Sequence, residues 1–252
     1  MIPLKWPVRT PLLCLVAAFV AFFGRVAAQD DLLLHDDLFV MGDAGEDPSP
    51  DLNRYERLNR SLGADSVRIC NGQPCIGWVE DLYPDSSLKH RGYYDAGLLT
   101  VYRNYHPNGV LEREFKALDA VKSIMRTYHS NGNIRSEARY ADGIPYRYED
   151  HYVDGKLRYE EEKHRKDPYY ITMNLYAADG LPVSTLELVD KKKIEFTQKE
   201  FHPGGALKCS GQARYDRSRM DTQRIGTWVY YDTAGAVIRE EDYADGKLAT
   251  VR

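Results

Sequence analysis

The feature that most constrains this chain is a short unit that recurs from about residue 105 to the end. Each copy has an aromatic residue, a polar pair, a glycine and an aliphatic residue. The clearest copies run from Tyr105 to Leu111, from Tyr128 to Ile134 and from Tyr152 to Leu157, and weaker copies begin at Tyr176, Phe201 and Tyr231. The shared glycines, spaced by 23, 23, 25, 25 and 30 residues, are Gly109, Gly132, Gly155, Gly180, Gly205 and Gly235. A period of this size predicts a repeat architecture whose units depend on their neighbours.

The residues around these glycines predict β-hairpins. Asn-Gly or Asp-Gly pairs end at Gly109, Gly132, Gly143, Gly155, Gly180 and Gly246, and such pairs favour a two-residue turn with positive φ at both positions. The sequence between them alternates with a period of two, as in strands with one buried face. A period near 23 residues fits two strands and two turns. We therefore expect an all-β fold, an elongated antiparallel β-hairpin repeat array forming a meander; a β-sandwich is the alternative.

One stretch carries a competing signal. Leu111, Phe115, Leu118, Val121 and Met125 follow one another at helical spacings. Leu111, Arg113 and Phe115 also alternate with Glu112, Glu114 and Lys116, and the repeat places a turn near 118–120. We expect two strands here.

The first residues have the order of a secretory signal peptide: basic residues, an apolar run from Pro11 to Phe23, then small residues. The apolar run is shorter than the roughly 20 residues of a membrane-spanning helix, and Cys14 lacks the context of a lipoprotein cysteine. We predict a signal peptide over 1–28, an acidic linker or cap over 29–66 and hairpin repeats over 67–252. The mature chain is expected to be exported (periplasmic, cell-surface or secreted) without a transmembrane segment.

Charge is concentrated before the repeats. The whole chain has a net charge of −4, and removing the three basic residues of the signal peptide makes it −7. Eight acidic residues precede Arg54, so the repeat body is nearly neutral. Nucleic acid as a partner is disfavoured, because it requires a concentrated basic face.

The cysteines and histidines favour structural roles. Cys70 and Cys75 flank a turn sequence and are expected to form a disulfide in an exported protein; Cys209 is expected to be a buried thiol. His106, His129 and His202 occupy the same position in different repeats, so they should be spread along the array. A metal site needs converging ligands, and we predict no metal and no cofactor.

We predict no enzyme, because phosphate-binding, serine-nucleophile and zinc-protease motifs are absent. The charged runs 160–167 and 191–193 are expected to be exposed loops. The binding candidates are aromatic: Tyr146, Tyr148, Trp78 and Trp228. The alternative for these rings is that they form the hydrophobic layer of the array.

The repeat units resemble the variant MORN-repeat proteins, including YwqK-like antitoxins. The resemblance rests on the tyrosine-to-glycine units, on Gly226 to Tyr231, and on Glu114, Glu137 and Glu160, each five residues after a turn glycine. It covers about residues 76–252 and implies a hairpin array that binds partners, toxins among them. The expected function is a non-catalytic, exported protein-protein interaction scaffold, toxin-neutralising in the manner of an antitoxin or immunity protein. Binding of cell-wall or surface glycan is the alternative.

Overall fold

The computed structural model describes residues 50–252, all within the compact unit Asp47–Arg252. The signal peptide predicted over 1–28 and the segment 29–49 lie outside the described residues. Among the described residues, no helix is long and apolar enough to cross a membrane.

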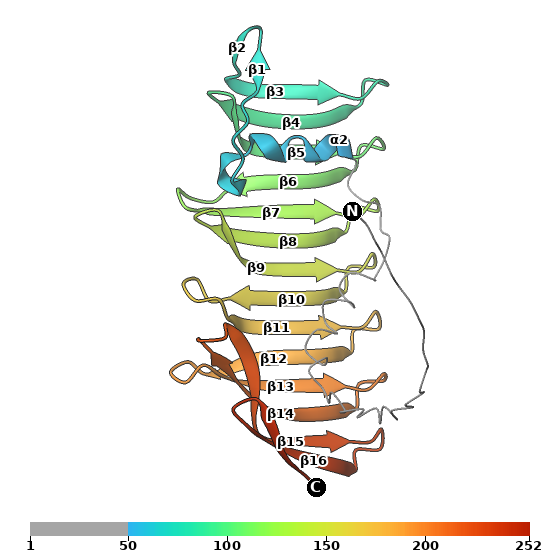
Figure 1. The fold of residues 1–252 in the computed structure, drawn as a ribbon. Coiled ribbons are helices and arrows are strands. Elements are labelled where there is room, and N and C mark those ends of the chain that lie inside the picture. Colours follow the sequence, from blue (N-terminus) through green and yellow to red (C-terminus); the bar gives the residue numbers. More distant parts are fainter. Residues whose placement is uncertain (1–49) are drawn as a thin grey trace, which may run out of the picture. The chain divides into compact units, whose positions relative to one another are not determined.

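Fifteen strands form one antiparallel sheet in which each strand pairs with its neighbours in sequence (Figure 1). The predicted all-β meander of hairpins is confirmed, and the sheet is neither closed nor paired into a sandwich. The strands are β3 (Gly77–Leu82), β4 (Leu88–Asp95), β5 (Leu98–Tyr105), β6 (Leu111–Ala117), β7 (Lys122–Tyr128), β8 (Ile134–Ala141), β9 (Ile144–His151), β10 (Leu157–Lys163), β11 (Tyr170–Tyr176), β12 (Pro182–Asp190), β13 (Glu195–Phe201), β14 (Leu207–Asp216), β15 (Asp221–Tyr231), β16 (Val237–Ala244) and β17 (Lys247–Val251).

Short elements precede the sheet. They are a helical turn, α2 (Pro50–Asn53), the 3₁₀ turns η1 (Glu56–Leu58) and η2 (Arg60–Leu62), and a two-stranded hairpin of β1 (Ile69–Cys70) and β2 (Gln73–Pro74). We call residues 50–75 the cap.

The ambiguous stretch 111–125 forms two strands, β6 and β7, as expected. The Asp119 side chain accepts hydrogen bonds from the backbone N–H groups of Val121 and Lys122 and so builds the turn between the strands. Leu118 and Val121 are exposed in this turn. The helical spacing of the apolar residues in this stretch therefore does not correspond to a buried helix face.

The turns differ from the expectation of one hairpin type. At Asp142-Gly143 and Asp245-Gly246 both residues have positive φ, as a two-residue turn requires. At Gly109 only the glycine does: its N–H donates to His106 C=O, while His106 N–H donates to Val110 C=O. This is a type I turn followed by a left-handed residue, which forms a bulge. The same pattern recurs at Gly132, Gly155, Gly180 and Gly235; the Gly205 turn keeps the two hydrogen bonds, but Gly204 before it also has positive φ.

Strand register sorts the side chains onto two faces. We call one face the cap face, and two rows of cross-strand neighbours lie on it. The first row consists of Asp81, His90, Asn104, Arg113, Thr127, Ser136, Asp150 and Tyr159. The second row consists of Val79, Gly92, Tyr102, Phe115, Met125, Ala138, Tyr148 and Glu161. The opposite, charge face carries the row Glu80, Arg91, Arg103, Glu114, Arg126, Glu137, Glu149 and Glu160. Burial is concentrated in two clusters, one under the cap and one around Phe196 on β13.

Candidate functional site

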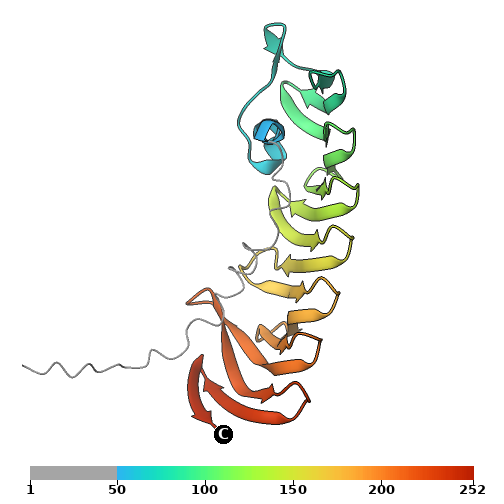
Figure 2. The same ribbon diagram turned by 90° about the vertical axis from the view of Figure 1, so that its right-hand side faces the viewer.

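The cap lies over the cap face at β4 to β6 (Figure 2). Leu52 and Tyr55 are buried and pack with Tyr94, Tyr102 and Phe115, and the hydrophobic contacts of this cluster extend to Met125 on β7. Glu56 forms an ion pair with Arg113, whose guanidinium also contacts Glu112 at 3.2 Å. The sheet therefore holds a short amphipathic segment through aromatic packing and one buried cation.

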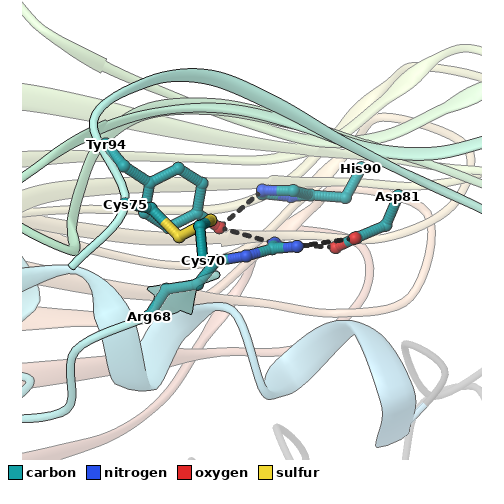
Figure 3. Close-up of a disulfide and its surroundings, with 6 residues drawn as sticks. All are labelled: Arg68, Cys70, Cys75, Asp81, His90 and Tyr94. Atoms are coloured by element: carbon teal, nitrogen blue, oxygen red, sulfur yellow. Dashed lines mark hydrogen bonds and ion pairs between the residues drawn. A yellow bond between two sulfur atoms is a disulfide. The ribbon is translucent and has the colours of Figure 1, made fainter. Parts of the chain in front are cut away.

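A polar network fixes the cap at its other end (Figure 3). Arg68 donates two hydrogen bonds to the Asp81 carboxylate, at 2.7 and 2.8 Å, and a third to the Tyr94 hydroxyl. The Tyr55 hydroxyl also donates to Asp81, and its ring stacks on His90 with centroids 3.7 Å apart. Burial alone would raise the pKa of Asp81, but the hydrogen bonds from Arg68 and Tyr55 outweigh it and lower the pKa to about 2.

His90 lies fully buried at the centre of this network. One ring nitrogen is 2.7 Å from the Asn104 side-chain oxygen and the other is 2.9 Å from the Tyr94 hydroxyl. Burial lowers the pKa of His90 to about 4, against the opposing effect of the Asn104 hydrogen bond. His90 is thus neutral at physiological pH, and its role here is structural.

The predicted pair Cys70 and Cys75 forms a disulfide in the structure, with Cα atoms 5.0 Å apart, and it closes the β1–β2 hairpin. Cys75 is buried in the cluster under the cap. Cys209 is a free, buried thiol, and burial raises its pKa to about 12.

Beyond β7 the cap face carries half-buried tyrosines in place of the cap's hydrophobic contacts. The rings of Tyr148 on β9 and Tyr159 on β10 have centroids 6.4 Å apart, and the Tyr159 hydroxyl donates to Glu161. Burial raises the pKa of Tyr148 to about 12. Asp150, buried in the adjacent row, pairs with Arg158. We call the surface formed by Tyr148, Asp150, Tyr159 and Glu161 the tyrosine surface. It combines aromatic rings with a buried charge, as does the part of the cap face that the cap covers.

The other aromatic candidates lie elsewhere. Tyr146 falls at a register shift in β9, with the Arg165 guanidinium 5.0 Å from its ring centroid. Trp78 is 56% exposed at the edge strand β3. Trp228 has no exposed surface: its ring lies against Gly211 and its N–H donates to Gln212 C=O. Trp228 is therefore a core residue, and the prediction that it offers a binding ring is corrected.

Two of the three repeated histidines, His129 and His202, join successive repeats. His129 lies 3.0 Å from the backbone oxygen of His151, and His202 lies 2.9 Å from that of Tyr231. Within residues 50–252, no cluster of His, Cys, Asp and Glu could hold a metal ion. The run from Glu160 to Lys163 belongs to strand β10 instead of the expected loop, because its side chains alternate between the two faces; Lys191 to Lys193 lie in an exposed turn.

A cleft of about 360 Å³ lies between η2 and the turns after β6 and β8. Arg60 and Lys122 line it together with Asp119 and Asp142, so its charges balance. Asp119 is already bonded to its own turn, and nothing in the lining selects a ligand.

The polar partners of the cap, Glu56, Arg68, Asp81 and His90, were not predicted from the sequence. The i, i+3 spacing of Leu52, Tyr55 and Leu58 in the acidic segment is the signal that could have revealed a docked amphipathic turn.

Comparison with known proteins supports the repeat type. Residues 124–142, which cover most of the β7–β8 hairpin, match the family model described as MORN repeat variant. The chain therefore contains a MORN repeat variant, as the resemblance implied. No curated protein matches the chain.

Two solved structures show a distant likeness. A TarM mutant from S. aureus in complex with Fondaparinux, alpha-GlcNAc-glycerol and UDP is 9% identical over 77% of this chain and 24% of its own, with a TM-score of 0.23. A second TarM structure is 10% identical over 77% of this chain and 26% of its own, with a TM-score of 0.24. This chain thus spans about a quarter of those chains, and at these TM-scores neither likeness carries an argument about function.

Proposed function

We propose that this chain is a non-catalytic interaction scaffold whose tyrosine surface binds a segment of a partner protein. The observation that carries the proposal is the cap: the chain's own residues 50–58 already use the neighbouring part of the same face as a docking site. The strand rows continue without interruption from the covered part to the tyrosine surface. Repeat arrays commonly present such continuous faces to partners.

The cap also indicates what kind of segment fits. Leu52 and Tyr55 fill aromatic contacts while Glu56 reaches a buried arginine. The tyrosine surface offers Tyr148 as an aromatic contact and lies next to Arg158. The partner segment is therefore amphipathic, with apolar or aromatic residues beside a carboxylate.

The predicted signal peptide supports a partner outside the cytoplasm. An exported toxin is one partner of this kind, and its neutralisation would make the chain an immunity-like protein. This finer role rests on the resemblance to YwqK-like proteins and on the signal sequence.

Site-specific photo-crosslinking tests the proposal. A photoreactive phenylalanine at Tyr148 should crosslink one protein from envelope fractions. The same group at Glu149, the next residue on the opposite face of β9, is the control and should not. Equal crosslinking at both positions, or none at either, would contradict binding at the tyrosine surface.

Glycan binding is the second candidate, because Tyr148 and Tyr159 offer neighbouring rings and Arg165 lies over Tyr146. Here the full chain should sediment with purified cell-wall material, and Tyr146→Ala with Tyr148→Ala should abolish sedimentation. Sedimentation unaffected by both changes would remove this alternative.

A further inference from the structure

Strand β3 ends the sheet with a free edge. Within residues 50–252, β3 pairs only with β4. The Tyr83 N–H donates to Ser87 C=O, toward β4. Because backbone groups alternate along a strand, those of Asp81 and Val79 also face β4, while those of Trp78, Glu80 and Leu82 face outward. An unpaired edge of this kind is a template for another strand.

Trp78 and Leu82 on this edge are apolar and exposed, and the exposed carboxylate of Glu80 lies between them. Leu82 is 55% exposed, and Ile76, which precedes the strand, is 78% exposed. The Trp78 and Tyr93 rings lie in a T-shaped arrangement with centroids 5.6 Å apart, and the Arg91 guanidinium lies 5.1 Å from the Trp78 ring centroid. Tryptophan, tyrosine and arginine together are the composition of a protein-binding hot spot.

The opposite edge, β17, is built differently. It has five residues with a register shift beside Ala249, and a lysine begins it. Short length, bulges and lysines protect an edge from pairing. Strand β3, in contrast, keeps an unbroken register with β4 from Gly77 to Asp81.

The number of strands decides which partner suits β3. The sheet has fifteen strands and every neighbouring pair is antiparallel, so β3 and β17 run in the same direction. Translating one copy along the sheet would therefore pair its β17 with the next copy's β3 in parallel, and the contact would never close. Two β3 strands related by a twofold axis pair antiparallel and close into a dimer.

We propose that two copies of this chain associate through antiparallel pairing of their β3 strands about an axis at Val79. Residues directly opposite each other must have their side chains on the same face of the sheet. Because side chains alternate between the faces, an odd-numbered residue of one β3 must lie opposite an odd-numbered residue of the other, and an even-numbered residue opposite an even-numbered one. Centring on Val79 places Trp78 opposite the other copy's Glu80, next to the guanidinium of the arginine that covers Trp78. It also brings Leu82 of one copy to the Ile76 end of the other. Centring on Glu80 would place two carboxylates opposite each other, which is unfavourable.

The cap hairpin adds to this site. β1 and β2 extend past β3 in both views (Figures 1 and 2), and Ile69 on β1 is exposed. The hairpin is joined to β3 at Ile76, and Leu82 of the other copy would lie beside this residue in the dimer. The disulfide that closes the hairpin therefore supports one wall of the proposed interface.

Sedimentation of the full chain over about 1 to 500 µM tests the proposal, since an interface of two six-residue strands should be weak. We expect a monomer–dimer equilibrium that Glu80→Pro weakens at least tenfold, because proline removes an outward N–H and leaves the bonds to β4 intact. Val251→Pro makes the matched change at the other edge, since Arg252 N–H faces Glu240 and Val251 N–H faces outward; it should leave the equilibrium unchanged. A monomer at all concentrations, or a dimer broken only by Val251→Pro, overturns the proposal.

A crosslink tests the register independently of proline's effect on folding. Val79→Cys should form a disulfide-linked dimer in mild oxidant, because the two Val79 residues form a close, non-hydrogen-bonded pair. Val251→Cys should remain monomeric. A dimer that crosslinks through Val251→Cys and not Val79→Cys would contradict pairing at β3.

Discussion

At the residue scale, two glycines within strands matter more for packing than their backbone angles suggest. A Cβ on Gly92 would come within 2.4 Å of Leu99 and 2.6 Å of His90, and a Cβ on Gly211 within 2.4 Å of three Trp228 ring atoms. Both glycines lie on the cap face, and each makes room for a large buried neighbour. The repeat pattern identifies glycines in turns. These two strand glycines are required for a different reason, because neighbouring side chains fill the space that a Cβ atom would need.

Gly211→Ala should therefore destabilise the fold by about 1–3 kcal/mol through overpacking. Gly226→Ala is the control: its Cβ would meet nothing within 4 Å, so only its left-handed backbone, φ 65°, adds a cost of about 1–2 kcal/mol. Urea unfolding of both variants measures the difference. In a double-mutant cycle, the cost of Gly211→Ala should shrink when Trp228→Leu is also present, whereas the cost of Gly226→Ala should not change. An unchanged cost of Gly211→Ala without the tryptophan ring would contradict this cause.

His90 makes stability depend on pH. Its pKa is lowered to about 4 in the folded chain and lies near 6.5 when unfolded. As the pH falls, His90 is therefore protonated in the unfolded chain before it is protonated in the folded chain. Its contribution to the free energy of unfolding is complete above about pH 6.5 and is lost as the pH falls toward 4. The loss should approach about 3 kcal/mol. His90→Gln should flatten this part of the profile, measured as the free energy of unfolding from pH 4 to 7; parallel profiles for the two proteins would contradict the assignment.

At the element scale, the cap is a separate piece attached to the sheet by specific contacts. Tyr55 enters the core, Arg68 and Asp81 pair, and the disulfide closes the hairpin that leads into β3. The contacts of Tyr55 and Arg68 join the cap to β3, β4, β5 and β6, so the first repeats gain a covering layer that the middle repeats lack.

Replacing both Cys70 and Cys75 by serine should loosen the cap. A cross-link over a five-residue separation contributes about 2 kcal/mol by the chain-entropy estimate. Hydrogen exchange should therefore quicken in residues 50–75, while β8 to β16 keep their protection. Faster exchange throughout the sheet would show that the cap is not a separate unit.

The sequence predicts the elements well where the signal is local. Turn glycines and alternation locate the hairpins, and the turn at Asp119 decides the ambiguous stretch 111–125. It fails where long-range packing decides the outcome. The burial of Trp228 depends on Gly211, seventeen residues earlier. The His90 network joins residues from the cap and three strands, which no short motif encodes.

At the scale of the whole molecule, the sheet has no single core. Each strand pairs only with its sequence neighbours, and buried residues gather around Phe115 under the cap and around Phe196 on β13. The tyrosine surface lies between these clusters, on half-buried strands. In arrays of this kind, stability is approximately a sum of repeat and nearest-neighbour contributions, so the strands of the tyrosine surface are stabilised mainly by their immediate neighbours.

This arrangement predicts that damage stays local. Phe115→Ala and Phe196→Ala each remove a fully buried ring and should cost about 3–5 kcal/mol within their own cluster. Hydrogen exchange should lose protection in β4 to β7 for the first variant and in β11 to β14 for the second, because the two clusters share no residue. Loss of protection along the entire sheet in either variant would mean that the fifteen strands unfold as one cooperative unit. If the sheet unfolds cooperatively, a partner bound to the tyrosine surface would slow hydrogen exchange at both ends of the sheet. If unfolding is local, the partner would slow exchange only in β8 to β11. The same exchange measurement distinguishes the two cases.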